Sequence, residues 1–96
     1  MPWVLEIISD DRTGGEKVAV NEGVLTIGRQ NCDIMLNDLK VSKHHCSIYL
    51  HGGELTIVDN SSTNGTYVNG RRVDKKEIHA GDVIIVGATN IKVVNV

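Results

Sequence analysis

Residues 46–59 read CSIYLHGGELTIVD. In the first part of this stretch apolar and polar side chains alternate, and an extended chain with this alternation has one apolar face, formed by Cys46, Ile48 and Leu50. Gly52-Gly53 is a turn signal, and the run from Glu54 to Asp59 contains further β-branched residues. The stretch therefore predicts two antiparallel strands, each with one buried face.

The rest of the chain repeats this pattern, because short apolar runs are separated by turn residues about every 8 to 12 residues. Asn21-Glu22-Gly23 and Asn69-Gly70 predict hairpin turns, and Asp10–Gly15 predicts a turn after the first strand. No stretch has a sustained helical period. We expect about ten strands, which outside residues 46–59 are Trp3–Ile8, Lys17–Val20, Val24–Ile27, Asp33–Leu36, Tyr67–Val68, Arg72–Val73, Asp82–Val86 and Ile91–Val96.

The composition favours the same class. Val and Ile supply 23 of the 96 residues, whereas Leu and Ala supply 9. β-branched side chains suit pleated strands and lose rotamer freedom in helices. The length is that of one domain, which we place at residues 1–96. We expect an all-β domain of two packed antiparallel sheets, with an aliphatic core because the chain has only one Trp, two Tyr and no Phe.

Charge and cysteine content exclude several classes of protein. The chain has 10 basic and 12 acidic residues, a net charge of −2, whereas nucleic-acid-binding domains usually carry a basic excess. No apolar run is long enough to span a membrane, and Met1–Ile8 lacks the basic start of a signal peptide. Cys32 and Cys46 are too few for a disulfide framework. We therefore expect an intracellular protein of the nucleus or cytoplasm, with no direct nucleic-acid or membrane partner.

Three polar connectors interrupt the strand pattern, and connectors on a rigid sandwich often carry binding residues. Gly28-Arg29 ends a strand and presents a guanidinium group. Lys40–His45 offers a hydroxyl group, two ammonium groups and two imidazole rings, and its Ser42-Lys43 pair suits an anion. Asn60–Gly65 supplies hydroxyl, amide and backbone N–H donors without any charge. Each connector also has an ordinary structural explanation as a solvated turn.

Taken together, the order and spacing of these motifs closely resemble the forkhead-associated (FHA) domain family. The resemblance rests on Gly28-Arg29, on Ser42-Lys43-His44-His45 as a Ser-x-x-His element, and on Ser62-Thr63-Asn64-Gly65-Thr66 followed by Asn69-Gly70. It covers nearly the whole chain. It implies an antiparallel β-sandwich of about eleven strands (FHA/SMAD-like) with the binding loops gathered at one end.

The resemblance further implies phosphothreonine-dependent binding of peptides, with no cofactor. It assigns the phosphopeptide contacts to Arg29, Ser42, Lys43, Thr63, Asn64 and Asn69, and structural support of the site to Gly28, His45 and Gly65. A phosphothreonine carries about −1.5 to −2 charges and three strong acceptor oxygens, which suits a mixture of cations and hydroxyl or N–H donors.

One position departs from the family pattern. Many members have Arg directly after the motif Ser, and here Lys43 keeps the charge but lacks the bidentate fork. Similar positions in the family help to read the third residue after the phosphothreonine. Because Lys40 lies nearby in the sequence, we expect an acidic residue to be preferred there.

The expected partner is thus a phosphothreonine-containing protein in DNA-damage, cell-cycle or kinase signalling. The alternative is a phosphate-independent interaction or self-association scaffold that uses the sheet faces, where Tyr49 and Tyr67 are candidates for a second surface. A homodimer, formed through a phosphothreonine of the parent chain or through a sheet face, stays open.

Three other functions fit the residues less well. Ser42, His45 and Asp59 are the residue types of a hydrolase triad, but Ser42 lacks a nucleophile elbow and an oxyanion motif, so we expect no enzyme activity. No metal site is expected, because the candidate ligands lack metal-binding spacing and alternate in direction on an extended chain; they are Cys32, His44, His45, Cys46 and His51. Cys46 instead predicts a buried free thiol.

The last of the three is a nucleic-acid-binding barrel. A basic stretch supports it, formed by Arg71, Arg72, Lys75 and Lys76, but no aromatic stacking platform accompanies these residues. We therefore expect a solvated hairpin.

Overall fold

The computed structural model describes residues 2–8 and 15–96, so most of the turn predicted at Asp10–Gly15 lies outside the described residues. Strands alone make up the regular structure of the described part. It contains no helix that could span a membrane. The strands are β1 (Trp3–Ile8), β2 (Glu16–Val20), β3 (Gly23–Gly28), β4 (Ile34–Met35), β5 (Cys46–His51), β6 (Glu54–Asp59), β7 (Thr66–Val68), β8 (Arg71–Val73), β9 (Lys75–Ile78), β10 (Val83–Val86) and β11 (Thr89–Asn95).

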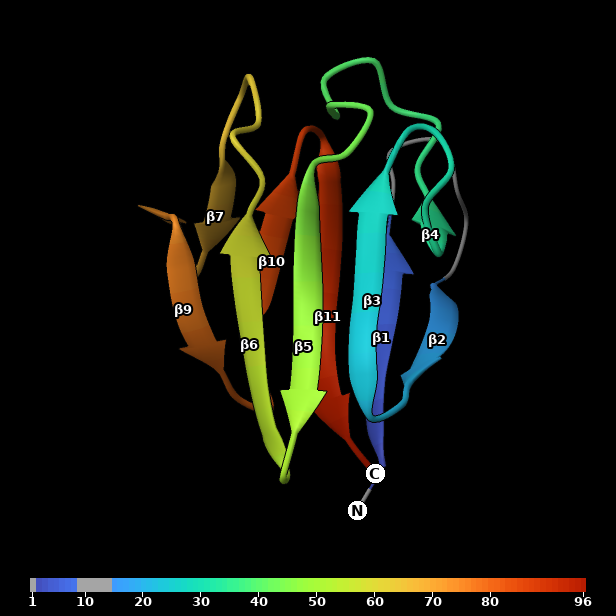
Figure 1. The fold of residues 1–96 in the computed structure, drawn as a ribbon, viewed down its shortest axis with the longest axis vertical. Helices are drawn as coiled ribbons and strands as arrows, with labels where there is room; N and C mark the ends of the chain where they lie inside the picture. The colour runs from blue at the N-terminus through green and yellow to red at the C-terminus, as the bar shows by residue number, and fades with distance from the viewer. Residues whose placement is uncertain (1, 9–14) are drawn as a thin grey trace.

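The strands form two sheets that pack face to face (Figure 1). One sheet has six strands in the order β2-β1-β11-β10-β7-β8, and the other has five in the order β4-β3-β5-β6-β9. Every pair is antiparallel except β3–β4, which is parallel. The prediction of an all-β sandwich of about eleven strands is thus confirmed, with one parallel pair at the edge of the second sheet.

The core lies between the sheets and is built from the alternating apolar positions of the strands. Cys46, Ile48 and Leu50 of β5 are buried, as the alternation predicts, and Tyr49 between them is 44% exposed. The largest of the fully buried side chains are aliphatic apart from His45 and include Leu5, Ile7, Ile27, Ile57, Ile84 and Ile91. His45 is therefore a polar group placed at the edge of an apolar core.

Local pairing confirms two predicted hairpins and corrects a third. β5 pairs with β6 across Gly52-Gly53, and β7 pairs with β8 across Asn69-Gly70. The predicted hairpin across Asn21-Glu22-Gly23 is wrong, because β2 pairs with β1 in one sheet whereas β3 pairs with β5 in the other. The turn carries the chain between the sheets.

β9 was not predicted from the sequence. It reads Lys75-Lys76-Glu77-Ile78, and only Ile78 is buried. Charged side chains are common on edge strands, because they discourage pairing with another chain. The pairing of β9 with β6 places it at the edge of the five-stranded sheet.

The topology brings the polar connectors to one end of the sandwich. The segments after β3, before β5, and between β6 and β7 all lie at the upper end in Figure 1, together with the turn between β10 and β11. Three connectors that are far apart in the sequence thus become neighbours.

Candidate functional site

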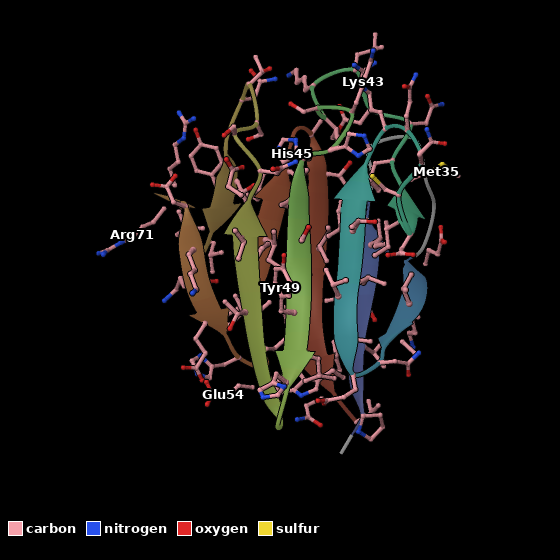
Figure 2. The ribbon with its side chains drawn as sticks, viewed as in Figure 1. Met35, Lys43, His45, Tyr49, Glu54 and Arg71 are labelled. Atoms are coloured by element: carbon pink, nitrogen blue, oxygen red, sulfur yellow. The ribbon has the colours of Figure 1, made fainter. Side chains whose placement is uncertain are left out.

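His45 fastens the connector before β5 to the connector after β6. Its Nδ1 accepts the backbone N–H of Ser42 at 3.0 Å, and its Nε2 lies 2.9 Å from the carbonyl oxygen of Gly65. A carbonyl can only accept, so Nε2 carries the proton and the ring is neutral. The imidazole is completely buried. Figure 2 shows His45 below the loop from which Lys43 extends.

Ser42 forms the second link between these loops. Its hydroxyl oxygen accepts the backbone N–H of Thr63 at 3.0 Å. The hydroxyl proton of Ser42 is then free to point elsewhere, because the oxygen is acting as an acceptor. Thr63 itself is exposed, and Ser42 is half-buried. Two of the predicted phosphate contacts are therefore side by side at the surface.

Asn64 adds a third link. Its side-chain Nδ2 donates to the carbonyl oxygen of Lys40 at 2.8 Å. Its amide oxygen is directed by this bond, since the two ends of a planar amide move together. The Lys40 side chain is exposed. The structure thus brings Lys40, Ser42, Thr63 and Asn64 into one surface cluster.

Arg29 joins the cluster from the end of β3. Its Nε donates to the carbonyl oxygen of Val41, and its backbone N–H donates to the carbonyl oxygen of Ser42 at 3.2 Å. The side chain is half-buried, which leaves the terminal guanidinium nitrogens as further donors. Arg29 therefore both supports the Lys40–His45 loop and adds positive charge to it. The exposed Lys43 extends this charge.

Two glycines are required by close packing. A side chain at Gly28 would overlap the carbonyl oxygen of Lys43 and lie 2.9 Å from the sulfur of Cys32. Gly65 has a φ of 88°, in the left-handed region that favours glycine, and a Cβ there would lie 2.7 Å from Nε of Arg72. This geometry is consistent with the structural role that the resemblance implies for Gly28 and Gly65.

Asp59 organises the loop that holds Thr63 and was not predicted as a support. Ser62 donates to it twice, from its hydroxyl at 2.6 Å and its backbone N–H at 3.1 Å, and the Thr66 hydroxyl donates at 2.7 Å. Burial opposes ionisation of Asp59, but the hydrogen bonds from Ser62 and Thr66 outweigh it and hold the pKa of the carboxyl below its usual value. The only sequence signal is an Asp placed three residues before a Ser at a strand end.

Asp38 is a second unpredicted support. It accepts the backbone N–H of Lys40 at 2.9 Å, and it accepts the backbone N–H of Ala88 at 2.8 Å and the Thr89 hydroxyl at 3.0 Å. Burial raises the pKa of this carboxyl, and the three hydrogen bonds more than compensate, so that its pKa is lowered. Asp38 thereby ties the Lys40–His45 loop to the turn between β10 and β11.

The structure does not bring Asn69 to this cluster. Asn69 follows β7 at the end opposite Thr66, and its side chain donates to Asp82 and accepts the backbone N–H of Val83, both at 3.0 Å. Its φ of 51° is the left-handed conformation of a hairpin turn. Both ends of the amide thus bond to residues at the start of β10, and Asn69 is not part of the surface cluster.

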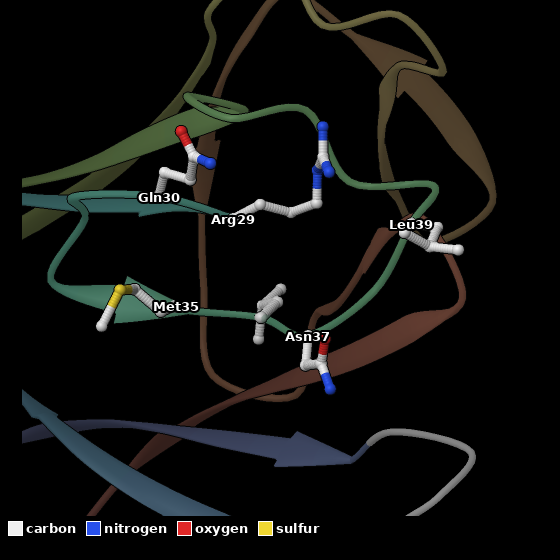
Figure 3. A pocket seen from close by; sticks show the side chains of 6 residues that line it. Arg29, Gln30, Met35, Asn37 and Leu39 are labelled. Carbon is white, nitrogen blue, oxygen red and sulfur yellow. The ribbon is translucent and has the colours of Figure 1, made fainter.

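A pocket of about 240 Å³ lies beside Arg29 (Figure 3). The Arg29 side chain extends along it, and the 62% exposed Met35 and 92% exposed Leu39 lie at its two ends. The remaining lining residues are Gln30, Leu36 and Asn37. The pocket is continuous with the cluster, because Arg29 belongs to both.

Among the described residues, neither the triad nor the metal site suggested by residue types is assembled. Both ring nitrogens of His45 bond to backbone groups, and Asp59 bonds to Ser62 and Thr66, so these two residues do not form a triad with the Ser42 hydroxyl. Within residues 2–8 and 15–96, no group of three or more His, Cys, Asp or Glu side chains is placed to hold a metal ion. Cys46 is a buried free thiol, as predicted, and burial raises its pKa to about 12.

Known proteins resemble this chain in sequence. Over 85 residues it is 39% identical to the ABC transporter ATP-binding/permease protein Rv1747 of Mycobacterium tuberculosis. The alignment covers 88% of this chain and 10% of Rv1747. It is 34% identical over 84 residues to the glycogen accumulation regulator GarA of Mycolicibacterium smegmatis, covering 86% of this chain and 53% of GarA. The chain thus spans about half of GarA and a tenth of Rv1747.

Solved structures resemble it in fold. An FHA domain studied for phosphothreonine-dependent interactions superimposes with a TM-score of 0.91 at 33% identity and covers all of this chain and 98% of that one. The FhaA FHA domain, solved in complex with the intracellular domain of Rv3910, superimposes with a TM-score of 0.86 at 35% identity, covering 95% of this chain and 98% of that one.

The FHA domain sequence model matches residues 25–87, which is more than half of the chain and contains every loop of the cluster described above. The two solved FHA-domain structures share the fold of this chain over nearly all of their length. The chain therefore belongs to the FHA domain family.

Proposed function

We propose that this domain binds phosphothreonine-containing peptide segments of partner proteins through the loop cluster around Ser42 and Thr63. The observation that carries the proposal is the hydrogen bond from the Thr63 N–H to the Ser42 hydroxyl oxygen, which joins two hydroxyl-bearing residues at one point of the surface. The cations of Lys43, on the same loop as Ser42, and of Arg29, which donates to that loop, support the proposal. The neutral ring of His45, which is buried under this point, holds its two loops together through hydrogen bonds to Ser42 and Gly65.

The chemistry of a phosphothreonine fits this point. Its phosphate is a dianion with three strong acceptor oxygens, and Arg29 and Lys43 supply positive charge while Ser42 and Thr63 supply directed hydroxyl donors. Because Ser42 accepts the N–H of Thr63, its own proton is available for a phosphate oxygen. Asn64, whose amide is oriented by its bond to the Lys40 carbonyl, would bond the peptide backbone.

The proposed partner is a phosphorylated protein, and the domain acts as a binding module and not as an enzyme. FhaA, which is similar in fold, has been solved with a protein domain bound, and GarA is a regulator by name. The names of these relatives lend no weight to a DNA-damage or nuclear context. We therefore propose phosphothreonine recognition in a regulatory protein, without a DNA-damage or nuclear role.

Two features beside the cluster bear on the sequence preference of the peptide. Lys40 presents an exposed ammonium group, which supports the expected preference for an acidic residue after the phosphothreonine. Beside Arg29, the pocket between Met35 and Leu39 is lined by apolar and amide side chains, so that an uncharged side chain of the same peptide could pack against the part formed by Met35, Leu36 and Leu39. The acidic preference and the uncharged preference are compatible if they concern different residues of the peptide.

The test is binding to a degenerate phosphothreonine peptide library, with phosphoserine and unphosphorylated libraries in parallel. Wild-type protein is expected to retain only phosphothreonine peptides, and Arg29→Ala is expected to lose them, since one charge-assisted hydrogen bond is worth about 1.5 to 3 kcal/mol. Arg71→Ala is the matched control, because it removes the same charge from an exposed site that points away from the loops (Figure 2).

Equal retention of unphosphorylated peptides, unaffected by Arg29→Ala, would instead favour the sheet-face scaffold. That surface would lie on the outer face of the five-stranded sheet, where Val24 is 54% and Tyr49 is 44% exposed. A homodimer through this face would then appear as a concentration-dependent mass in sedimentation.

A further inference from the structure

Arg72 of β8 lies against the loop that holds Thr63. Its Nε, Cζ and Cδ would lie 2.7, 3.1 and 3.2 Å from a Cβ built on Gly65. The guanidinium group therefore rests on the backbone of the Asn60–Gly65 connector, two residues from Thr63. The absent side chain of Gly65 is what leaves space for it.

The strand register explains why Arg72 reaches this position. Arg72 is directly opposite Tyr67 in the β7–β8 pair, and directly opposed residues share one face of a sheet. The residues that flank Tyr67, namely Thr66 and Val68, are buried between the sheets. Tyr67 and Arg72 therefore share the outward face, next to the end of the connector.

Within the described part of the fold, the guanidinium group of Arg72 forms no salt bridge. Arg72 is exposed. Arg29, Lys40 and Lys43 lie on the connectors before β5, whereas Arg72 lies on the far side of the Asn60–Gly65 connector. The cluster thus has cations on both sides of Thr63.

We propose that Arg72 is a specificity-determining residue that binds a second anionic side chain of the phosphothreonine peptide, on the flank that leaves the site over Gly65. The inference rests on the proposed function and adds a second subsite to it. The chemistry recognised is an acidic group in reach of a guanidinium fork, supplied either by a carboxylate or by a second phosphate.

The structure supplies an internal control for this subsite. Arg71 is the neighbour of Arg72, carries the same charge, is also exposed, and pairs with Val68 on the opposite face of β8. Figure 2 shows Arg71 extending sideways from the sandwich, away from the loops. Loss of either arginine changes the net charge equally, so a difference between the two variants reports position and not overall charge.

The experiment measures the affinity of phosphothreonine peptides in which one flanking position at a time, on either side, carries Ala, Glu or a second phosphothreonine. Wild-type protein, Arg72→Ala and Arg71→Ala are compared. In wild-type protein and Arg71→Ala we expect an acidic group at one flank to raise affinity about three- to tenfold, as a surface guanidinium pair allows. In Arg72→Ala this gain is expected to vanish.

The outcomes separate the two claims. A gain with Glu identifies a carboxylate as sufficient, and a gain with phosphothreonine alone identifies a phosphate; either supports the inference when it requires Arg72. Phosphothreonine binding with no flank position that depends on Arg72, or with equal loss in Arg71→Ala, overturns the inference and leaves the proposed function standing. Failure of wild-type protein to bind any phosphothreonine peptide overturns both.

Discussion

Ser42 donates its backbone N–H to Nδ1 of His45 at 3.0 Å, and this contact determines which ring nitrogen is protonated. Nε2 then donates to the carbonyl oxygen of Gly65, so one neutral, buried side chain joins two loops that lie 20 residues apart in sequence. The buried imidazole of His45 thus helps to fix the backbone that positions the Ser42 hydroxyl.

Substitution of His45 by Ala is expected to destabilise the domain and to weaken phosphopeptide binding together. It leaves the N–H of Ser42 and the carbonyl of Gly65 without partners and opens a cavity, at a cost of about 2 to 4 kcal/mol. Urea unfolding measures the effect. His51→Ala is the control, since the His51 side chain is 97% exposed and its loss should change stability by no more than about 0.5 kcal/mol. Equal effects of the two substitutions would contradict the role given to His45.

Asp59→Asn is expected to lower stability in a pH-dependent way. The pKa of Asp59 is lowered in the folded protein, so its contribution is complete above the unfolded value of about 3.9 and is lost as the pH falls through the folded value. The difference in unfolding free energy between wild-type protein and Asp59→Asn should therefore be constant above about pH 5 and shrink below about pH 4. If this free-energy difference instead grows as the pH falls, the pKa of Asp59 is raised in the folded protein and the prediction is contradicted.

Gly28→Ala is expected to displace the loop that carries Lys43, because the added methyl group overlaps the backbone carbonyl of Lys43, which accepts the N–H of Gln30. Overpacking of this kind costs about 1 to 3 kcal/mol. Gly15→Ala is the control, since its Cβ would come close only to the flexible side chain of Glu6, at 2.9 Å, and would be in ordinary contact with Ile8 at 3.7 Å. Thermal unfolding compares the two variants, and an unchanged midpoint for Gly28→Ala would show that the close approach is relaxed in solution.

The two thiols are expected to react at very different rates. Burial raises the pKa of Cys46 to about 12, so almost none of it is thiolate at neutral pH, and Cys46 is 2% exposed, whereas Cys32 is half-buried. Alkylation of native protein followed by mass mapping should label Cys32 first and Cys46 only after unfolding. Labelling of Cys46 at the same rate as Cys32 would mean that the start of β5 opens readily.

Local patterning predicted those parts of the fold that depend on neighbouring residues. The β5–β6 hairpin follows from alternation and a Gly-Gly turn, both of which act within a few residues. The hairpin predicted at Asn21-Glu22-Gly23 was wrong, because turn residues do not determine whether the chain reverses within one sheet or passes to the opposite sheet. β9 was missed because an edge strand needs only one apolar side chain, here Ile78.

The candidate site could be predicted in its surface residues and in three of its supports, Gly28, His45 and Gly65, but not in the supports Asp38 and Asp59. Ser42 and Thr63 belong to motifs whose order is readable, and the structure places them together. Asp38 could not be predicted, because its partners Ala88 and Thr89 lie about fifty residues away and only tertiary structure joins them. Asn69 has the right motif context but lies at the far end of a short strand, a placement that sequence order does not reveal.

The most direct measurement of the central claim is a titration of the ¹⁵N-labelled domain with a phosphothreonine peptide selected from the library. The account predicts that the largest amide shifts fall on Arg29, Ser42, Thr63 and Asn64, and that the unphosphorylated peptide causes none of them. Shifts centred on Tyr49 and the outer face of the five-stranded sheet, present with both peptides, would contradict it.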